Sequence, residues 1–141
     1  MKKPELNITI KLITSKDSKF LFQLLSKRKI NESISHKKMP NFSQHLKFIS
    51  SKPYSKWYII FHQNKKIGSI YLSKQNEIGL FLIDIKSENE IRWIAIKLLM
   101  QKNPRHRYLA NINPKNKKMS NFYKKNSFNL IQHTYELDFE D

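Results

Sequence analysis

The stretch NPKNKKMSNFYKKNSF, from Asn113 to Phe128, decides the fold of this chain. Asn113 and the proline after it predict a turn, and Asn116 is a residue type that caps the start of a helix. Tyr123 follows two helical turns later. Ser127 then occupies a turn position, and Phe128 leads out of it. The stretch therefore predicts a short capped helix that ends in a turn and continues into a last strand.

The segments before and after this helix carry strand and helix patterns. Strands are predicted where apolar residues alternate or form short runs between turn residues, and helices where they recur at helical spacing. The predicted strands are 8–13, 57–62, 67–72, 77–85, 108–112 and 129–139. A first helix is predicted after possible N-caps at Ser15 and Asp17, a second after Asn41 or Ser43, and a third over 91–100. Residues 31–40 are predicted to form a loop.

The closing stretch resembles the motif N-x-x-A-x-x-x-Y-x-x-x-G-F of the GNAT family of N-acetyltransferases. Asn116, Tyr123 and Phe128 match the motif, and Ser127 stands where the family has Gly. The hairpin containing Gly68 and the strand EIGLFL also resemble family segments. The segment from Ile34 to Phe48 is similar to members that acetylate amino sugars.

This resemblance covers essentially the whole chain and implies its fold. We expect a single domain over 1–141 with a mixed α+β architecture. A central mixed sheet of about six or seven strands would carry helices on both faces. The strand ending near Ile85 and the strand 108–112 would be parallel neighbours that diverge at one end, with the helix between them as the crossover.

The composition narrows the classes of partner. The chain has no Cys, which excludes disulfides, thiolate metal sites and a Cys nucleophile. The net charge of +16 could indicate an anionic partner such as nucleic acid, a nucleotide sugar or coenzyme A, or it could be compositional, since Lys, Asn and Ile are abundant throughout. The lysines are dispersed and Arg is scarce, which favours the compositional origin for most of the charge and argues against nucleic acid. No signal sequence or membrane span is predicted, so we expect a soluble cytoplasmic protein that is a monomer or a homodimer.

The family's pyrophosphate-binding loop is altered in this chain. Ser87 stands where the family has Gln or Arg, and Glu90 and Arg92 replace two glycines. Two interpretations stay open. The loop could still present its backbone amides to the pyrophosphate with the help of Arg92. Alternatively, Glu88 and Glu90 could cap the helix, satisfy its dipole and repel the phosphates.

The resemblance also implies roles for individual residues. Tyr123 would protonate the departing thiolate, although it could instead be a packing aromatic. His36 or Glu77 would take a proton from the acceptor amine, although each could be an exposed residue without a role. His133 and Tyr135, on the last predicted strand, could face either the acceptor or the core. The residues expected to contact the cosubstrate are Leu82, Ile83, Ile85, Ser87, Arg92, Asn116 and Tyr123.

The resemblance therefore implies an acetyltransferase that moves an acetyl group from acetyl-CoA to an amine of a small molecule, with an amino sugar as the first choice. The alternative is a protein of the same fold that has lost turnover and serves as a binding or interaction module. The five histidines show no ligand spacing, so no metal site is predicted.

Overall fold

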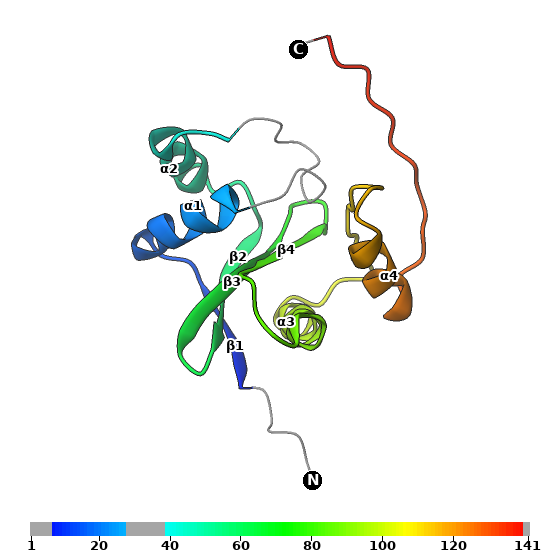
Figure 1. Cartoon of the computed structure of the whole chain (residues 1–141), viewed down its shortest axis with the longest axis horizontal. Helices are drawn as coiled ribbons and strands as arrows, with labels where there is room; N and C mark the ends of the chain where they lie inside the picture. The colour runs from blue at the N-terminus through cyan, green and yellow to red at the C-terminus, as the bar shows by residue number, and fades with distance from the viewer. Residues whose placement is uncertain (1–6, 28–38, 140–141) are drawn as a thin grey trace.

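The computed structural model describes residues 7–27 and 39–139 (Figure 1). The strands are β1 (Ile8–Leu12), β2 (Lys56–His62), β3 (Lys65–Leu72) and β4 (Ile78–Leu82). The helices are the short 3-10 helix η1 (Ser15–Asp17), α1 (Ser18–Ser26), α2 (Phe42–Ser50), α3 (Glu88–Lys102) and α4 (Lys117–Lys125). No helix among the described residues is long and apolar enough to cross a membrane.

Four strands form an antiparallel sheet in the order β1-β2-β3-β4. Local sequence explains the tight β2–β3 hairpin, because Gln63 and Asn64 both adopt positive φ angles, of 50° and 66°. Opposite Tyr71 of β3 lies Gly79 of β4, and opposite Gly68 lies Leu82. This register fixes which side chains of β3 and β4 share a face of the sheet.

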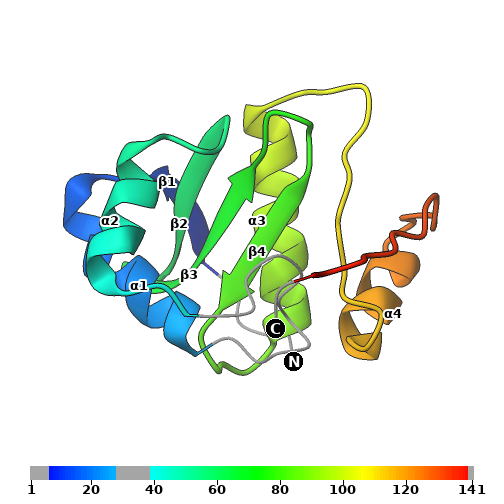
Figure 2. The same ribbon diagram turned by 90° about the horizontal axis from the view of Figure 1, so that it is seen from above.

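Helices cover both faces of the sheet, as predicted (Figure 2). One face carries α1 and α2, which pack against each other. The other face carries α3, which contacts β1, β3 and β4. The residues fully buried between α3 and the sheet form the main core, and they include Ile60, Ile70, Leu72, Ile96 and Leu99.

The edge of the sheet beyond β4 begins as a parallel pairing and then opens. Leu109 forms an isolated parallel bridge with Glu77, in which Ile78 N donates to Leu109 O at 2.7 Å and Leu109 N donates to Asn76 O at 2.9 Å. No further backbone hydrogen bond joins β4 to residues 110–112 in the described part of the chain. The predicted parallel relation is therefore confirmed, and the two segments pair only at the start of β4.

Two predicted strands differ from the structure. Residues 108–112 make only the single bridge at Leu109, and residues 129–139 form no strand within the described ranges. The described sheet thus has four strands, and the expected six or seven are not confirmed. Both segments have strand-like sequences, but a strand needs a hydrogen-bonded neighbour, which local sequence does not supply.

Candidate functional site

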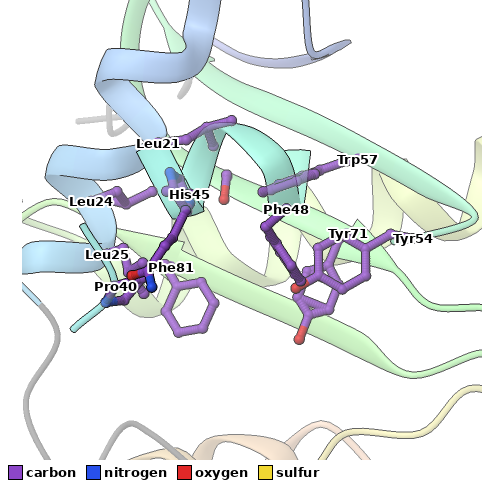
Figure 3. Close-up of a pocket in the computed structure, with 12 residues that line it drawn as sticks. Leu21, Leu24, Leu25, Pro40, His45, Phe48, Tyr54, Trp57, Tyr71 and Phe81 are labelled. Atoms are coloured by element: carbon purple, nitrogen blue, oxygen red, sulfur yellow. The ribbon is translucent and has the colours of Figure 1, made fainter. Parts of the chain in front are cut away.

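A cavity of about 260 Å³ lies between the sheet and the helix pair α1/α2 (Figure 3). This volume is near the lower end of the roughly 300–1,000 Å³ that is typical of small-molecule sites. Leucines of α1 form one wall, and aromatic side chains of the other elements form most of the remainder. The ring-bearing side chains that line it are His45, Phe48, Tyr54, Trp57, Tyr71 and Phe81.

The aromatic rings in the cavity wall are packed against one another. Tyr54 and Tyr71 stack with ring centroids 3.7 Å apart, and Trp57 meets Tyr54 edge-on at 4.8 Å. The Tyr71 ring lies over Gly79, where a Cβ atom would overlap it. Gly79 is therefore required for its lack of a side chain, which lets Tyr71 reach across β4.

His45 is the feature of the cavity that the site prediction missed. It is 5% exposed and lies on the inner face of α2, next to the Phe22 ring at 5.6 Å and the Phe48 ring at 6.4 Å. It is the only imidazole among the described lining residues, which include no Asp, Glu, Lys or Arg. The sequence pattern that could have identified His45 is its spacing of three residues from both Phe42 and Phe48, which places it on the apolar face of the predicted helix.

Beyond Ile78, the outer edge of β4 forms no backbone hydrogen bond with the described residues and faces the opening beside it. Ile83 N donates to Ile67 O of β3 at 2.8 Å, so the Ile83 amide points into the sheet. Because backbone direction alternates along a strand, the amides and carbonyls of Leu80 and Leu82 point the other way. Leu82 can thus offer hydrogen bonds to a ligand in the opening, whereas the amide of Ile83 cannot. Ile85 is half-buried against the core.

Tyr123 of α4 is buried beside Phe122 and Phe128, with 6% of its surface exposed. Its hydroxyl makes no hydrogen bond with the described residues. Burial raises the pKa of Tyr123 to about 12; Tyr71 adds to the rise and the Arg92 guanidinium opposes it. The phenol therefore keeps its proton at neutral pH and can act as a hydrogen-bond donor.

The start of α3 shows how the altered loop is arranged. Ser87 is the N-cap residue, adopts a left-handed conformation with φ of 60°, and makes no side-chain capping hydrogen bond. The Glu88 carboxylate instead forms ion pairs with Lys118 of α4 and with Arg92, the latter at 3.3 Å. A hydrogen bond from Lys118 lowers the pKa of Glu88, and Arg92 contributes to the same effect. Glu88 and Glu90 both lie in the first turn of α3, as the second interpretation requires, and the Glu88 carboxylate is in addition held by two cations.

The other predicted site residues lie in different places. The Asn116 side chain caps α4 by accepting from Met119 N at 3.2 Å. Glu77 lies at the β3–β4 turn and does not line the cavity; its carboxylate accepts from Ser73 Oγ at 2.9 Å and from the Asn111 amide. His36 lies outside the described residues.

The last predicted strand is not part of the cavity either. His133 and Tyr135 are exposed, Tyr135 by 91%. Their predicted position facing an acceptor or the core is therefore wrong for a single chain. Among the described residues, no group of three or more His, Asp or Glu side chains could hold a metal ion.

No protein-family model matches the sequence, and none of the curated proteins matches it. The fold does match solved structures. A spermidine N-acetyltransferase from Vibrio cholerae, solved with CoA and spermine, matches with a TM-score of 0.77 at 16% identity, over 95% of this chain and 88% of that one. The ribosomal L7/L12 alpha-N-protein acetyltransferase RimL, solved with coenzyme A, matches at 0.70 and 18% identity, over 91% and 86%. The N-acetyltransferase PseH from Campylobacter jejuni matches at 0.64 and 19% identity, over 90% and 91%.

These structures establish the fold. The chain has the mixed α+β fold of the GNAT acetyltransferases, which confirms the resemblance that the closing motif indicated. At sequence identities below 20% the similarity establishes the fold, whereas a function depends on the residues of this chain's own site.

Proposed function

We propose that this protein transfers an acetyl group from acetyl-CoA to the amine of a small molecule. The observation that supports this most directly is the position of β4. One side of the strand carries Phe81, which lines the cavity, while the backbone of Leu80 and Leu82 faces the opening at the sheet edge. An amine bound in the cavity and an acetyl-CoA bound in the opening would lie on the two sides of this one strand.

The residues around the opening fit acetyl-CoA. The backbone groups of Leu80 and Leu82, two residues apart on the outer edge of β4, can pair with the amides of a pantetheine arm. Arg92 and Lys118 supply two positive charges beside the loop, and the carboxylates of Glu88 and Glu90 in the first turn of α3 offset them. Ser87 makes no side-chain capping hydrogen bond at the start of α3, and the backbone amides there are the donors that we propose for the pyrophosphate. Ser87, Arg92 and Asn116 remain the proposed contacts on this side.

Acetyl-CoA, when bound, supplies the acetyl group as a thioester and leaves as a thiol. Tyr123 then acts as the donor of a hydrogen bond or a proton to the sulfur. Because its pKa is about 12, its proton is present throughout the neutral range, and its contribution is greatest where negative charge develops on sulfur. The nearby Arg92 counteracts part of the effect of burial and makes Tyr123 a stronger acid than burial alone would.

The acceptor amine must lose a proton during attack, and we assign the base to His45. An imidazole can accept a proton at neutral pH, and this one lies in the cavity wall. Glu77 is less suited, because Ser73 and Asn111 already bond to its carboxylate. His36, the base predicted from the sequence, precedes α2 in the chain and is tested beside His45 and Glu77 as a third candidate base.

The cavity favours an acceptor with a compact ring. Its walls are aromatic and aliphatic, which suits the apolar face of a sugar ring. The absence of Asp and Glu among the described lining residues argues against a polyamine, whose several ammonium groups would need anionic partners. An amino sugar therefore remains the first choice, and its attachment to an anionic carrier would suit the net charge of +16.

The experiment is a thiol-release assay with acetyl-CoA and a panel of acceptors. The panel contains amino sugars, nucleotide-linked amino sugars, spermidine and a peptide with a free N-terminus. We expect turnover with amino sugars and little with spermidine. His45→Gln, Glu77→Gln and His36→Gln should be compared as pH profiles of kcat/KM, and only the loss of the true base removes the acidic limb.

A second measurement distinguishes the alternative, a binding protein of the same fold without turnover. Acetyl-CoA that binds the folded chain must raise its melting temperature. A shift without turnover on any acceptor would favour the binding protein. No shift at millimolar acetyl-CoA would contradict the proposed cosubstrate altogether.

A further inference from the structure

The turn between β3 and β4 is held together by the side chain of Ser73. The hydroxyl oxygen accepts hydrogen bonds from Gln75 N at 3.2 Å and from Glu77 N at 3.0 Å, and the hydroxyl donates to Glu77 Oε1 at 2.9 Å. A hydroxyl has one donor and two acceptor positions, so these three contacts use all of them. The turn therefore holds one carboxylate oxygen of Glu77 in place and leaves the other for a second partner.

The second carboxylate oxygen of Glu77 contacts the segment that follows α3. Glu77 Oε2 accepts a hydrogen bond from the side-chain amide of Asn111, which lies 34 positions away in the sequence and is here called the Glu77–Asn111 link. Figure 2 shows that the chain leaves α3 at the end of the sheet where β3 turns into β4. Glu77 is half-buried and Asn111 is exposed, so either can be replaced without opening the core.

The link lies where the opening beside β4 begins. The bridge formed by Ile78 N with Leu109 O and by Leu109 N with Asn76 O holds the last backbone hydrogen bonds between the two segments among the described residues. Because backbone direction alternates along an extended chain, the backbone of Asn111 would be the next to pair with β4. It makes no backbone hydrogen bond within the described ranges. Asn111 is thus joined to the β4 side through its side chain, two residues into the opening.

Packing and the link restrain the segment 110–112 in different directions. Ala110 and Ile112 pack against the core, which holds the segment against the layer beneath the sheet. The distance to a neighbouring strand lies in the plane of the sheet, and hydrogen bonds set that distance. Beyond Leu109 the link acts in this direction, across the opening.

We propose that the Glu77–Asn111 link sets the width of the opening beside β4, so that Glu77 and Asn111 are positioning residues for acetyl-CoA. The inference rests on the proposed function, in which a pantetheine arm pairs with the backbone of Leu80 and Leu82. Each such hydrogen bond needs its partners within about 3 Å of each other. An opening of variable width binds the arm in only a fraction of its states, which lowers the apparent affinity by that fraction. In this role Glu77 acts through its hydrogen bonds and not as a base.

Two substitutions of Glu77 separate the link from the charge. Glu77→Ala and Glu77→Gln remove the same negative charge, but the glutamine oxygen can accept from Ser73 and its amide can donate to Asn111, once the Asn111 amide turns over. We expect Glu77→Ala to weaken acetyl-CoA binding about threefold to tenfold, as the loss of one hydrogen bond does, and Glu77→Gln to stay within about twofold of the unaltered chain. Asn111→Ala changes no charge and should weaken binding as Glu77→Ala does. Calorimetry at matched salt measures all three.

Exchanging the donor and the acceptor tests the link a second way. Asn111→Asp alone places two carboxylates side by side and should weaken binding at least as much as Asn111→Ala. Adding Glu77→Gln to it lets the new amide at position 77 donate to the new carboxylate at position 111, and it restores the original net charge. The double variant should therefore recover most of the affinity.

Hydrogen exchange without acetyl-CoA tests the link apart from the proposed function. The amides of Ile78 and Leu109, which form the bridge, should exchange about threefold to tenfold faster in Asn111→Ala and at nearly the unaltered rate in the double variant. In turnover, Asn111→Ala should raise the KM for acetyl-CoA and change kcat less, and the acidic limb of the pH profile should persist in Glu77→Gln.

The outcomes distinguish this inference from the proposed function. Unchanged exchange in Asn111→Ala, or faster exchange with unchanged acetyl-CoA affinity, would overturn the positioning role while leaving acetyl transfer intact. Equal effects of Glu77→Gln and Glu77→Ala would also overturn it, because the charge of Glu77 would then matter and not the link. An unaltered chain that does not bind acetyl-CoA would contradict the proposed function, and the positioning role with it.

Discussion

The carboxylate of Glu88, in the first turn of α3, is ion-paired with the ammonium of Lys118, in the first turn of α4. The pair joins the helix that follows the altered loop to the helix that carries Tyr123. The Glu88 carboxylate is paired with Arg92 as well as with Lys118, and these are two cations to which a pyrophosphate could bind. The ion pair therefore links α3 to α4, and we expect it to compete with the proposed ligand.

Replacing Glu88 with Gln should tighten the binding of acetyl-CoA. The substitution keeps the size of the side chain but removes the charge that occupies Lys118 and Arg92. We expect an affinity gain of about threefold to tenfold, which corresponds to about 1 kcal/mol and is typical of a partly exposed ion pair. Calorimetry at matched salt measures it.

Glu90→Gln is the control for this change, because it alters the net charge equally at the same helix start. It should change the affinity less than Glu88→Gln does. Weaker binding by Glu88→Gln would contradict the competition and would mean that Glu88 holds the two cations in the position that the pyrophosphate requires.

Tyr123→Phe should reduce turnover and leave acetyl-CoA affinity nearly unchanged. The ring and its packing against Phe122 and Phe128 are kept, and only the hydroxyl is lost. Loss of a general acid typically lowers kcat by about 100-fold or more. Tyr135→Phe, at an exposed tyrosine, is the control and should retain full turnover. A fully active Tyr123→Phe variant would rule out the assigned role.

Gly79→Ala should destabilise the fold through Tyr71. A Cβ at Gly79 would overlap the Tyr71 ring, and such overpacking costs about 1–3 kcal/mol. In a Tyr71→Ala background the same change should cost far less, because the overlap is absent. Chemical denaturation of the four proteins of this cycle measures the coupling.

Gly68→Ala provides the matched control for that cycle. Its Cβ would meet the backbone carbonyl oxygen of Phe81 and the side chain of Leu82, not the Tyr71 ring, so Tyr71→Ala should not relieve its cost. Equal costs of Gly79→Ala in both backgrounds would show that the Tyr71 ring does not lie over Gly79 in solution.

The stability of the fold should depend on the ionisation of Asp17. Burial would raise its pKa, but hydrogen bonds from Lys66 and from Thr14 outweigh this and lower the pKa below its ordinary value of 3.8. The ionised form is thus favoured by folding, so its contribution is present at neutral pH and is lost as the pH falls below about 3.8.

Asp17→Asn should therefore lower the melting temperature at pH 7, and the difference from the unaltered chain should shrink below about pH 4. Asp84→Asn serves as the control, because Asp84 forms no ion pair or hydrogen bond with the described residues. A difference for Asp17→Asn that is the same at pH 3 and pH 7 would show that the Asp17 ionisation does not stabilise the fold.

Features set by neighbouring residues could be predicted from the sequence. The β2–β3 hairpin follows from two apolar runs around Gln63 and Asn64, and α2 begins where Asn41 caps it, with Gln44 completing a capping box. The Asn116 cap and the spacing to Tyr123 indicated both α4 and the fold. Each of these signals acts within a few residues, so the local sequence contains the necessary information.

The remaining features join residues that are far apart in the chain, and only the tertiary structure decided them. His45 enters the cavity because α2 packs beside α1 over the sheet, and Glu88 reaches Lys118 because α4 returns to the start of α3. The pattern of residues 129–139 predicted a strand, but a strand forms only beside an edge that its chain can reach. Sequence thus determined which segments could be helices and strands. Their packing determined which side chains form the site and which strand-like segment stays outside the four described strands, because burial and sheet pairing are properties of the assembled chain.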